Sequence, residues 1–340
     1  MKRDGQTCVS PVNLWSSVGF ACMVEQERNK EADVSRQRML FALLVLLLAG
    51  SAFTVRGVEI ACTTTIVGDV VSQIVGDSAD VWVLLPTDAD PHAFEPRPQD
   101  VVALEHADLI FTNGVDLEAG MANILEAVTT PIVPLSDGLT GLLPADDHDE
   151  DENGEDDAHE HEGVDPHVWF DPMLVAQWID VIVDVVGHLV PSAVSSLADR
   201  GDAYRRELET LDAWIFASVA AIPEERRHLV SDHRVLAYYA HRYGFTLAGA
   251  VIPGISSLAE PSARGLAELI AAIEELDVPA IFVGTTANPA LAEQVAADTG
   301  THVVVLYTGS LSNRDGPAGT YLDFMRYTTT AIVEALGEVD

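Results

Sequence analysis

The stretch SAVSSLADRGDAYRRELETLDAWIFASVAA, residues 192–221, decides how this 340-residue chain is organised. It contains no proline and a single glycine, Gly201, while Pro191 and Pro223 stand just outside it. Its apolar side chains recur every three or four residues, which is the spacing of one helical face. The pattern predicts one helix of about 30 residues, roughly 45 Å long, that begins near Pro191 and ends before Pro223. The apolar positions are Val194, Leu197, Tyr204, Leu208, Leu211, Ile215 and Val219.

Short apolar runs alternate with helical patterns on both sides of this stretch. The expected strands are Val58 to Thr63, Val81 to Leu85, Leu109 to Thr112 and Ile132 to Leu135 before it, and His228 to Ser231, Thr246 to Val251, Ala280 to Val283 and His302 to Leu306 after it. The expected helices are Val67 to Val75, Asp100 to His106, Leu117 to Val128, Val235 to Tyr243, Pro261 to Leu276, Pro289 to Thr299 and Tyr321 to Leu336. Continuous apolar strands separated by helices indicate parallel sheets covered on both faces. The sequence therefore predicts an α/β fold with two similar lobes, each a parallel sheet flanked by helices, joined by one long helix. The expected divisions are a signal region with an extra N-terminal segment (residues 1–56), the N-terminal lobe (57–190), the linking helix (191–223) and the C-terminal lobe (224–340).

The N-terminal segment is expected to be a targeting region. Arg36 and Arg38 precede the apolar run at residues 39–49, and the small residues at 50–52 follow it. The run is shorter than the roughly 20 residues that span a bilayer, so a signal peptide is favoured over a transmembrane anchor. Residues 1–35 are unlike a secretory n-region and are interpreted as an extra segment before the true start. Position 51 is serine and not the cysteine that lipid acylation requires, so the sequence gives no support for a lipid anchor.

Charge and cysteine content narrow the function further. The chain has 54 acidic against 18 basic residues, a formal net charge of -36, and its lysines are confined to Lys2 and Lys30. Nucleic acid is therefore excluded as an expected partner. A strongly negative surface raises the local concentration of cations, although acid excess can also serve solubility alone. Cys62, the one cysteine after the targeting region, lies in an expected strand and is interpreted as a core residue without a disulfide partner.

Three dispersed histidines indicate a transition-metal site. His92 and His167 each end an Asp-Pro-His tripeptide, and His233 follows Ser231-Asp232. Imidazole nitrogen binds zinc, copper, nickel and iron well. His92 and His233 follow expected strands, and ligands of parallel α/β sheets bind at the carboxyl ends of the strands. We therefore expect two histidines of the first lobe and one of the second to converge in the cleft between the lobes.

The segment at residues 146–162 reads DDHDEDENGEDDAHEHE and contains no apolar side chain larger than alanine. Such a segment cannot bury a core and is expected to be a surface loop. We hypothesise that its histidines, His148, His159 and His161, capture metal and pass it to the cleft. The alternative is a solvated acidic loop in which the histidines are incidental.

At these residues the chain resembles a known family, the cluster A-I metal-binding receptors of ABC importers for zinc and manganese. The matching segments are Asp90 to Pro96, Asn113-Gly114 with Leu117-Glu118, Asp165 to Pro172, Asp232-His233 with Tyr239 and Arg242 to Phe245, Glu260 to Ser262, Ala287 to Pro289, and Thr320-Tyr321. The resemblance implies two pseudo-symmetric lobes, a metal in the cleft, and His92, His167 and His233 at the ligand positions. It also implies secretion across the cytoplasmic membrane, to the periplasm or the exterior of the cell envelope. The receptor is expected to act as a monomer and to deliver its metal to a membrane permease with a cytoplasmic ATPase. Glu118 and Glu260 match family positions and are expected to be structural or to hold a ligand histidine.

Two departures from the family bear on the choice of metal. Many relatives have an aspartate ligand where this chain has Gly309, and a carboxylate where it has Gly284. The fourth ligand is expected to be water or a carboxylate of the acidic loop, with Asp315 as a less favoured replacement. Manganese sites of the family use two histidines and two carboxylates, whereas three nitrogens with a weak fourth position suit zinc. Zn²⁺ is therefore the expected cargo, and Mn²⁺ is the alternative.

Two other functions fit the same residues less well. Three histidines and an open fourth position also describe hydrolytic zinc sites. The sequence, however, has no His-Glu-x-x-His segment and no glutamate paired with a ligand to act as general base. A surface adhesin that reuses the fold is the second alternative, since a fold does not set a function. Binding without catalysis is the expected function.

Overall fold

The computed structural model describes Met39, residues 57–145 and residues 163–337. Residues 1–56 and 57–340 form separate units, and the fold below is that of the second unit. Apart from Met39, the expected signal segment lies outside the described residues. So does the acidic loop with His148, His159 and His161.

The N-terminal lobe is built on a four-stranded parallel sheet with the strand order β2-β1-β3-β4. Its strands are β1 (Glu59–Cys62), β2 (Asp80–Val83), β3 (Leu109–Thr112) and β4 (Ile132–Pro134). The helices between them are α2 (Thr65–Val75), α3 (Pro98–His106) and the short α4 (Ala122–Leu125). Strand β3 is fully buried, with the unbroken apolar sequence Leu-Ile-Phe before Thr112, as expected of a strand covered on both faces.

The C-terminal lobe repeats this arrangement, with the strand order β6-β5-β7-β8 and all strands parallel. Its strands are β5 (His228–Ser231), β6 (Thr246–Ala250), β7 (Ala280–Gly284) and β8 (His302–Leu306). Its helices are α7 (Ala237–Tyr243), α8 (Ala263–Glu275), α9 (Ala290–Thr299) and α10 (Tyr321–Leu336). The predicted fold class, two lobes with parallel sheets flanked by helices, is confirmed.

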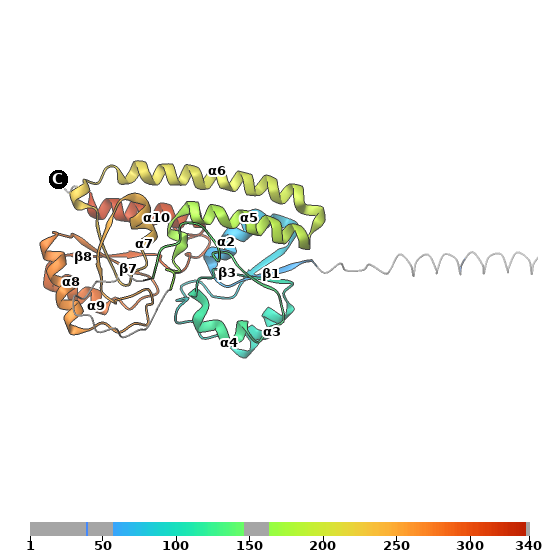
Figure 1. The fold of residues 1–340 in the computed structure, drawn as a ribbon, viewed down its shortest axis with the longest axis horizontal. Helices are drawn as coiled ribbons and strands as arrows, with labels where there is room; N and C mark the ends of the chain where they lie inside the picture. The colour runs from blue at the N-terminus through green and yellow to red at the C-terminus, as the bar shows by residue number, and fades with distance from the viewer. Residues whose placement is uncertain (1–38, 40–56, 146–162, 338–340) are drawn as a thin grey trace, which may run out of the picture. The chain divides into compact units, whose positions relative to one another are not determined.

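The long helix α6 (Val194–Val219) has 26 residues and follows a short 3-10 turn at Pro191–Ala193. Figure 1 shows α6 running over both lobes, above α5 (Pro172–Leu189) and α2 on one side and α10 on the other. Its buried side chains form the predicted stripe from Leu197 to Val219, whereas Val194, also expected on this face, is exposed. Gly201 lets α6 approach α5 closely, because a Cβ there would stand 2.9 Å from a methyl group of Ile179. Helix α6 therefore packs against helices of both lobes.

Helix α5 is apolar and long enough to pass as a membrane span by length and composition. It is instead a core helix, because Trp178, Ile179 and Ile182 on it are buried and it packs along α6. One continuous apolar cluster runs through the helices that join the lobes. It includes Ile60 and Phe111 of the first sheet as well as Phe282 of the second.

The prediction of a single helix over Leu117 to Val128 is wrong. A 3-10 segment (Leu117–Met121) precedes the four-residue α4, and Glu118 has non-helical backbone angles. The Glu118 carboxylate turns back to accept hydrogen bonds from the backbone N–H groups of Asn113 and Gly114, at 2.7 and 3.1 Å. This local polar contact competes with helix formation.

Candidate metal site

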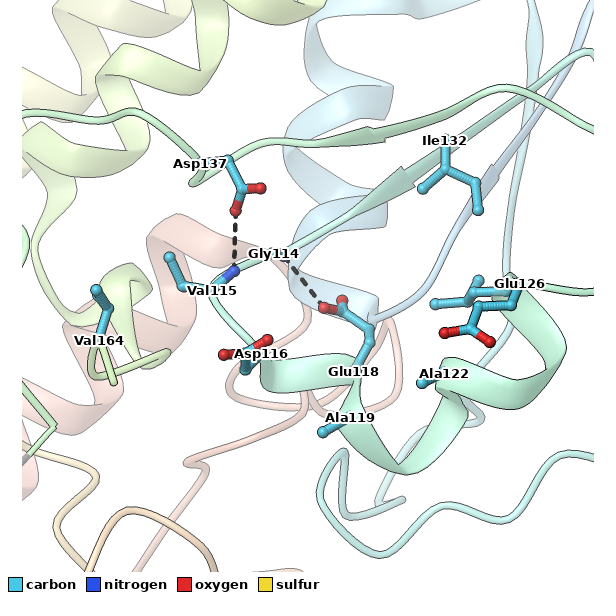
Figure 2. A pocket seen from close by; sticks show the side chains of 11 residues that line it. Gly114, Val115, Asp116, Glu118, Ala119, Ala122, Glu126, Ile132, Asp137 and Val164 are labelled. Atoms are coloured by element: carbon cyan, nitrogen blue, oxygen red, sulfur yellow. Dashed lines mark hydrogen bonds between the residues drawn. The ribbon is translucent and has the colours of Figure 1, made fainter. Parts of the chain in front are cut away.

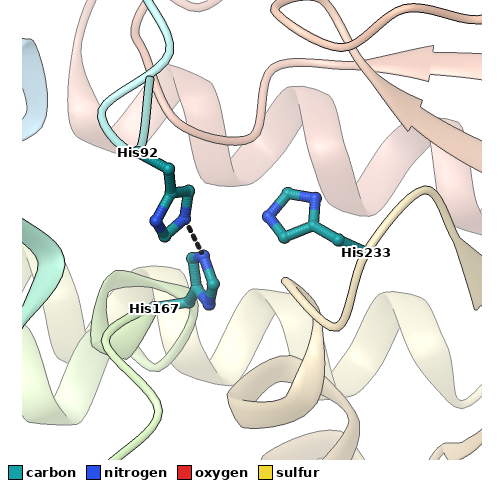
Figure 3. Close-up of side chains that lie close together, drawn as sticks. All are labelled: His92, His167 and His233. Carbon is teal, nitrogen blue, oxygen red and sulfur yellow. Dashed lines mark hydrogen bonds between the residues drawn. The ribbon is translucent and has the colours of Figure 1, made fainter. Parts of the chain in front are cut away.

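The three predicted histidines meet at the carboxyl ends of the strands. His92 lies in the segment between β2 and α3, His167 lies just before α5, and His233 follows β5. Their possible ligand atoms all lie within 4.8 Å of one another, and the Nε2 atoms of His92 and His167 are 3.1 Å apart. Figure 3 shows the three rings turned toward one another from three separate segments. Among the described residues, this is the one group of His, Cys, Asp and Glu side chains with the geometry to hold a metal ion.

An aspartate next to each of two histidines fixes the ring. The Nδ1–H of His167 donates to Asp165 Oδ1 at 2.8 Å, and the same oxygen accepts the His167 backbone N–H at 2.9 Å. Asp232 holds His233 in the same way, at 2.8 Å to Nδ1 and 2.7 Å to the backbone nitrogen. These bonds place the proton of each ring on Nδ1, so that both Nε2 atoms present a lone pair, the arrangement typical of metal-ligating histidines.

Burial keeps the imidazoles of His92 and His167 neutral. His167 and His233 are 1% and 5% exposed, whereas His92 is partly exposed. Burial, together with the neighbouring His167 and His233, lowers the pKa of His92 to about 2. Burial also lowers the pKa of His167, against the opposing effect of Asp165. Among the described residues, the buried Nε2 of His233 has no hydrogen-bond partner, which fits a lone pair reserved for a cation.

The space between the rings is small. The cavity has a volume of about 10 Å³ and is also lined by Thr286, Thr308 and Gly309. A cavity of this size holds about one water-sized sphere. The space between the rings therefore matches the size of a single ion.

The structure explains why position 309 offers no oxygen. Gly309 lines the cavity, but a Cβ on it would stand 2.8 Å from Cδ of Pro91. A side chain at Gly284 would collide with the hydroxyl of Thr308. Asp315 is exposed and does not belong to the histidine group. Among the described residues, no carboxylate completes the ligand set.

Polar contacts that the sequence analysis did not single out hold the two lobes together around the site. The indole Nε1–H of Trp169 donates to the Thr308 carbonyl at 2.9 Å, next to Gly309. The Leu311 backbone N–H donates to the Thr65 hydroxyl at 2.9 Å. Both bonds join the segment after β8 to the N-terminal lobe. Each bond has a backbone group as one partner, and residue type does not show which backbone group a side chain will bind.

Glu118 supports the site from a distance. Its buried carboxyl group, whose pKa is raised by burial, accepts the Thr63 hydroxyl at 2.6 Å as well as the two backbone bonds described above. The side chain of Asn113 then donates to the Pro166 carbonyl at 3.0 Å, one residue before His167. Glu118 therefore does not touch a ligand histidine. The other family-matched glutamate, Glu260, is exposed.

A larger cavity lies beside Glu118 in the N-terminal lobe. Its volume is about 560 Å³, and Figure 2 shows Glu118 pointing to Gly114 and Asp137 to Val115 at its edge. The bond from the Val115 backbone N–H to Asp137 is 3.1 Å long. None of the three clustered histidines lines this cavity. It is therefore distinct from the histidine site.

Known proteins resemble this chain over most of its length. The profile of the family described as "Zinc-uptake complex component A periplasmic" matches residues 60–335. The "Manganese-binding lipoprotein MntA" of Halalkalibacterium halodurans is 27% identical over 314 residues, covering 89% of this chain and all of that protein. The "Zinc-binding protein TroA" of Treponema pallidum is 28% identical over 283 residues, covering 82% and 88% of the two chains. The solved structure of the periplasmic zinc-binding protein TroA from Treponema pallidum superposes with a TM-score of 0.73 at 25% identity, covering 82% of this chain and 99% of that one.

Proposed function

Because the chain belongs to the family described as zinc-uptake complex component A, periplasmic, we propose that it captures Zn²⁺ through His92, His167 and His233 for an ABC importer. Members of this family are extracytoplasmic metal-binding receptors of ABC importers and not enzymes. In our proposal residues 57–190 and 224–340 are the two lobes, residues 191–223 link them, and the metal binds between the lobes.

One observation carries the proposal: three imidazoles from three separate segments place their ligand atoms within 4.8 Å of one another. Two of these rings are aimed by carboxylates, and the cavity between them has room for one ion. A surface cluster of histidines would not be buried and oriented in this way.

The donor set favours zinc over manganese. Imidazole nitrogen binds zinc strongly in four-coordinate sites, whereas Mn²⁺ stands low in the Irving–Williams order and prefers oxygen ligands. Among the described residues the site offers three nitrogens and no carboxylate. Water, or a carboxylate of residues 146–162, would complete the tetrahedron. Mn²⁺ remains the second candidate, because one relative is named as a manganese-binding lipoprotein.

Metal titration of single-histidine variants tests the proposal. The purified protein is expected to bind one Zn²⁺ tightly in competition with a chromophoric chelator, and Mn²⁺ at least a hundredfold more weakly. H167A and H233A should each weaken zinc binding at least a hundredfold, because each removes one of three ligands. H188A is the matched control, since His188 is exposed and pairs with Asp184 on α5. Tight zinc binding that survives H167A and H233A would exclude this site, and tighter binding of Mn²⁺ than of Zn²⁺ would reverse the choice of metal.

We propose further that His148, His159 and His161 capture zinc for the cleft. The flanks of their loop support a clean deletion, because Pro144 and Val164 form an antiparallel bridge and the Ala145 backbone N–H donates to the Gly163 carbonyl at 2.9 Å. Replacing residues 146–162 by a short glycine turn is expected to slow zinc loading and to remove any additional weakly bound zinc. Unchanged loading rate and stoichiometry would reject capture by the loop.

Delivery to a permease with a cytoplasmic ATPase completes the proposed function. Zinc uptake by membrane vesicles that contain the importer should depend on addition of this protein, and H167A should not support it. We propose that the receptor acts as a monomer, which light scattering of the zinc-loaded protein tests directly.

A further inference from the structure

The three aspartate–histidine pairs of the site are not equivalent. Asp165 and Asp232 bind the ring nitrogen of their histidines, as described above. Asp90 accepts a hydrogen bond from the backbone N–H of His92, at 2.9 Å, and none from its ring. Within the described part of the chain, the ring of His92 has one hydrogen-bond partner, the Nε2 of His167. His92 is therefore the least constrained of the three rings as well as the most exposed.

The second carboxylate oxygen of Asp90 is bound from the other lobe. The hydroxyl of Ser257, in the segment after β6, donates to Asp90 Oδ2 at 2.6 Å. A hydrogen bond to a charged acceptor is stronger than one between neutral groups. This bond crosses the cleft, from the C-terminal lobe to the tripeptide that carries His92.

The segment that carries Ser257 is also tied to His233. The Ile252 backbone N–H donates to the Asp232 carbonyl at 2.7 Å, and the Arg234 backbone N–H donates to the Gly254 carbonyl at 3.0 Å. Residues 251–257, which we name the β6 loop, thus hold the backbone on both sides of His233 and, through Ser257, the aspartate that precedes His92.

We propose that Ser257 is a positioning residue that holds His92 over the metal, so that breaking its bond to Asp90 is the step that releases the ion. This inference rests on the proposed zinc-binding function. His167 and His233 form the fixed part of the site, because their rings are fixed by carboxylates and are buried. His92 is the ligand that closes last on an entering ion and opens first. The β6 loop keeps it closed by joining the segment of His92 to that of His233.

Rates of zinc binding and release test this assignment. Release from the loaded full-length protein is followed by stopped flow after mixing with excess chelator, and association is followed with a fluorescent zinc indicator. S257A should release zinc about tenfold faster, the effect of one hydrogen bond to a charged group, with an association rate within twofold of the unchanged protein. S257T, which keeps the hydroxyl, should restore slow release.

Ser256 supplies the matched control. Its hydroxyl accepts the backbone N–H of Leu258, just after the β6 loop, at 3.2 Å and is not bonded to Asp90. S256A should leave the release rate unchanged. If S257A released zinc at the original rate, or if S256A accelerated release equally, Ser257 would have no positioning role.

The outcomes also separate this inference from the proposed function. Failure of the unchanged protein to bind zinc would contradict the proposed function. Tight zinc binding together with an unaltered release rate in S257A would contradict only the role of Ser257. A purely structural role would change both rates together, whereas S257A is expected to change only the release rate.

Discussion

At the residue scale, the buried imidazoles make the metal-free protein sensitive to acid. The pKa of His92 is lowered from 6.5 to about 2, so the folded state binds fewer protons than the unfolded chain between these values. Stability must then fall as the pH drops below about 6.5, by up to about 1.4 kcal/mol per pH unit for each such histidine. Above pH 6.5 this loss of stability is absent, because His92 is neutral in both the folded and the unfolded state.

Urea unfolding of the metal-free protein at pH 6.5 and pH 4.5 tests this sign. H92Q removes one titrating group, so it should lose about 2 kcal/mol less stability over this interval than the unchanged protein. H188Q, which alters an exposed histidine, should behave like the unchanged protein. If H92Q lost as much stability as the unchanged protein, the pKa of His92 would not differ between the folded and unfolded states.

Gly309 offers a steric prediction at the same scale. The added methyl group of G309A would stand 2.8 Å from Cδ of Pro91, which must then move together with the adjacent His92. Overpacking of this kind costs about 1–3 kcal/mol, and zinc affinity should fall about tenfold. G187A is the control, because its methyl group makes an ordinary 3.4 Å contact with Val194 on the outer helices. Unchanged affinity in G309A would show that Pro91 yields without disturbing His92.

At the element scale, α7 connects the site to the backbone that flanks the acidic loop. The hydroxyl of Tyr238 accepts the Leu143 backbone N–H at 3.1 Å and donates to the Asp165 carbonyl at 2.8 Å. Y238F leaves both partners unsatisfied, which costs about 1–3 kcal/mol. We expect severalfold weaker zinc binding, because Asp165 aims His167.

The neighbouring Tyr239 supplies the control on the same helix. Its hydroxyl donates to Thr329 of α10 at 3.1 Å and touches no site residue. Y239F should therefore lower the melting temperature and leave zinc affinity unchanged. Isothermal titration and thermal melting of both variants make the comparison, and equal affinities in Y238F and Y239F would refute the connection through α7.

The helices and strands also show which parts of the fold could be predicted from the sequence. Periodicity predicted α6, α10 and the strands, because buried elements leave a regular apolar pattern. It missed the break at Glu118, where a side chain takes the place of helical hydrogen bonds. The three histidines were predicted to converge because strand ends share one edge of a sheet. The different use of the two carboxylate oxygens of Asp90 and the contact of Gly309 with Pro91 depend on tertiary packing and leave no local pattern.

At the scale of the whole molecule, the shared core predicts cooperative unfolding. The main apolar cluster contains Phe111 of the first sheet, Leu208 of α6 and Phe282 of the second sheet. Neither lobe can lose its core without exposing the helices that cover the other. L208A should cost about 2–5 kcal/mol and should shift the unfolding of both lobes equally.

Hydrogen exchange read separately for peptides of β1 and β7 checks this expectation. Both strands should exchange with one common free energy of opening in the unchanged protein and in L208A. Two opening energies, with only one lowered by L208A, would mean that the lobes unfold independently.

The bond from Trp169 to Thr308 has a consequence for how the protein can be observed. The indole is 2% exposed, its centroid lies 5.2 Å from that of His167, and its N–H is held by the opposite lobe. Indole emission responds to nearby charge and polarity, so a dication arriving on His167 should change the intrinsic fluorescence, and W169F should abolish that change. Trp169 is thus an intrinsic fluorescence probe of metal binding, which reports binding and release in real time without any added dye.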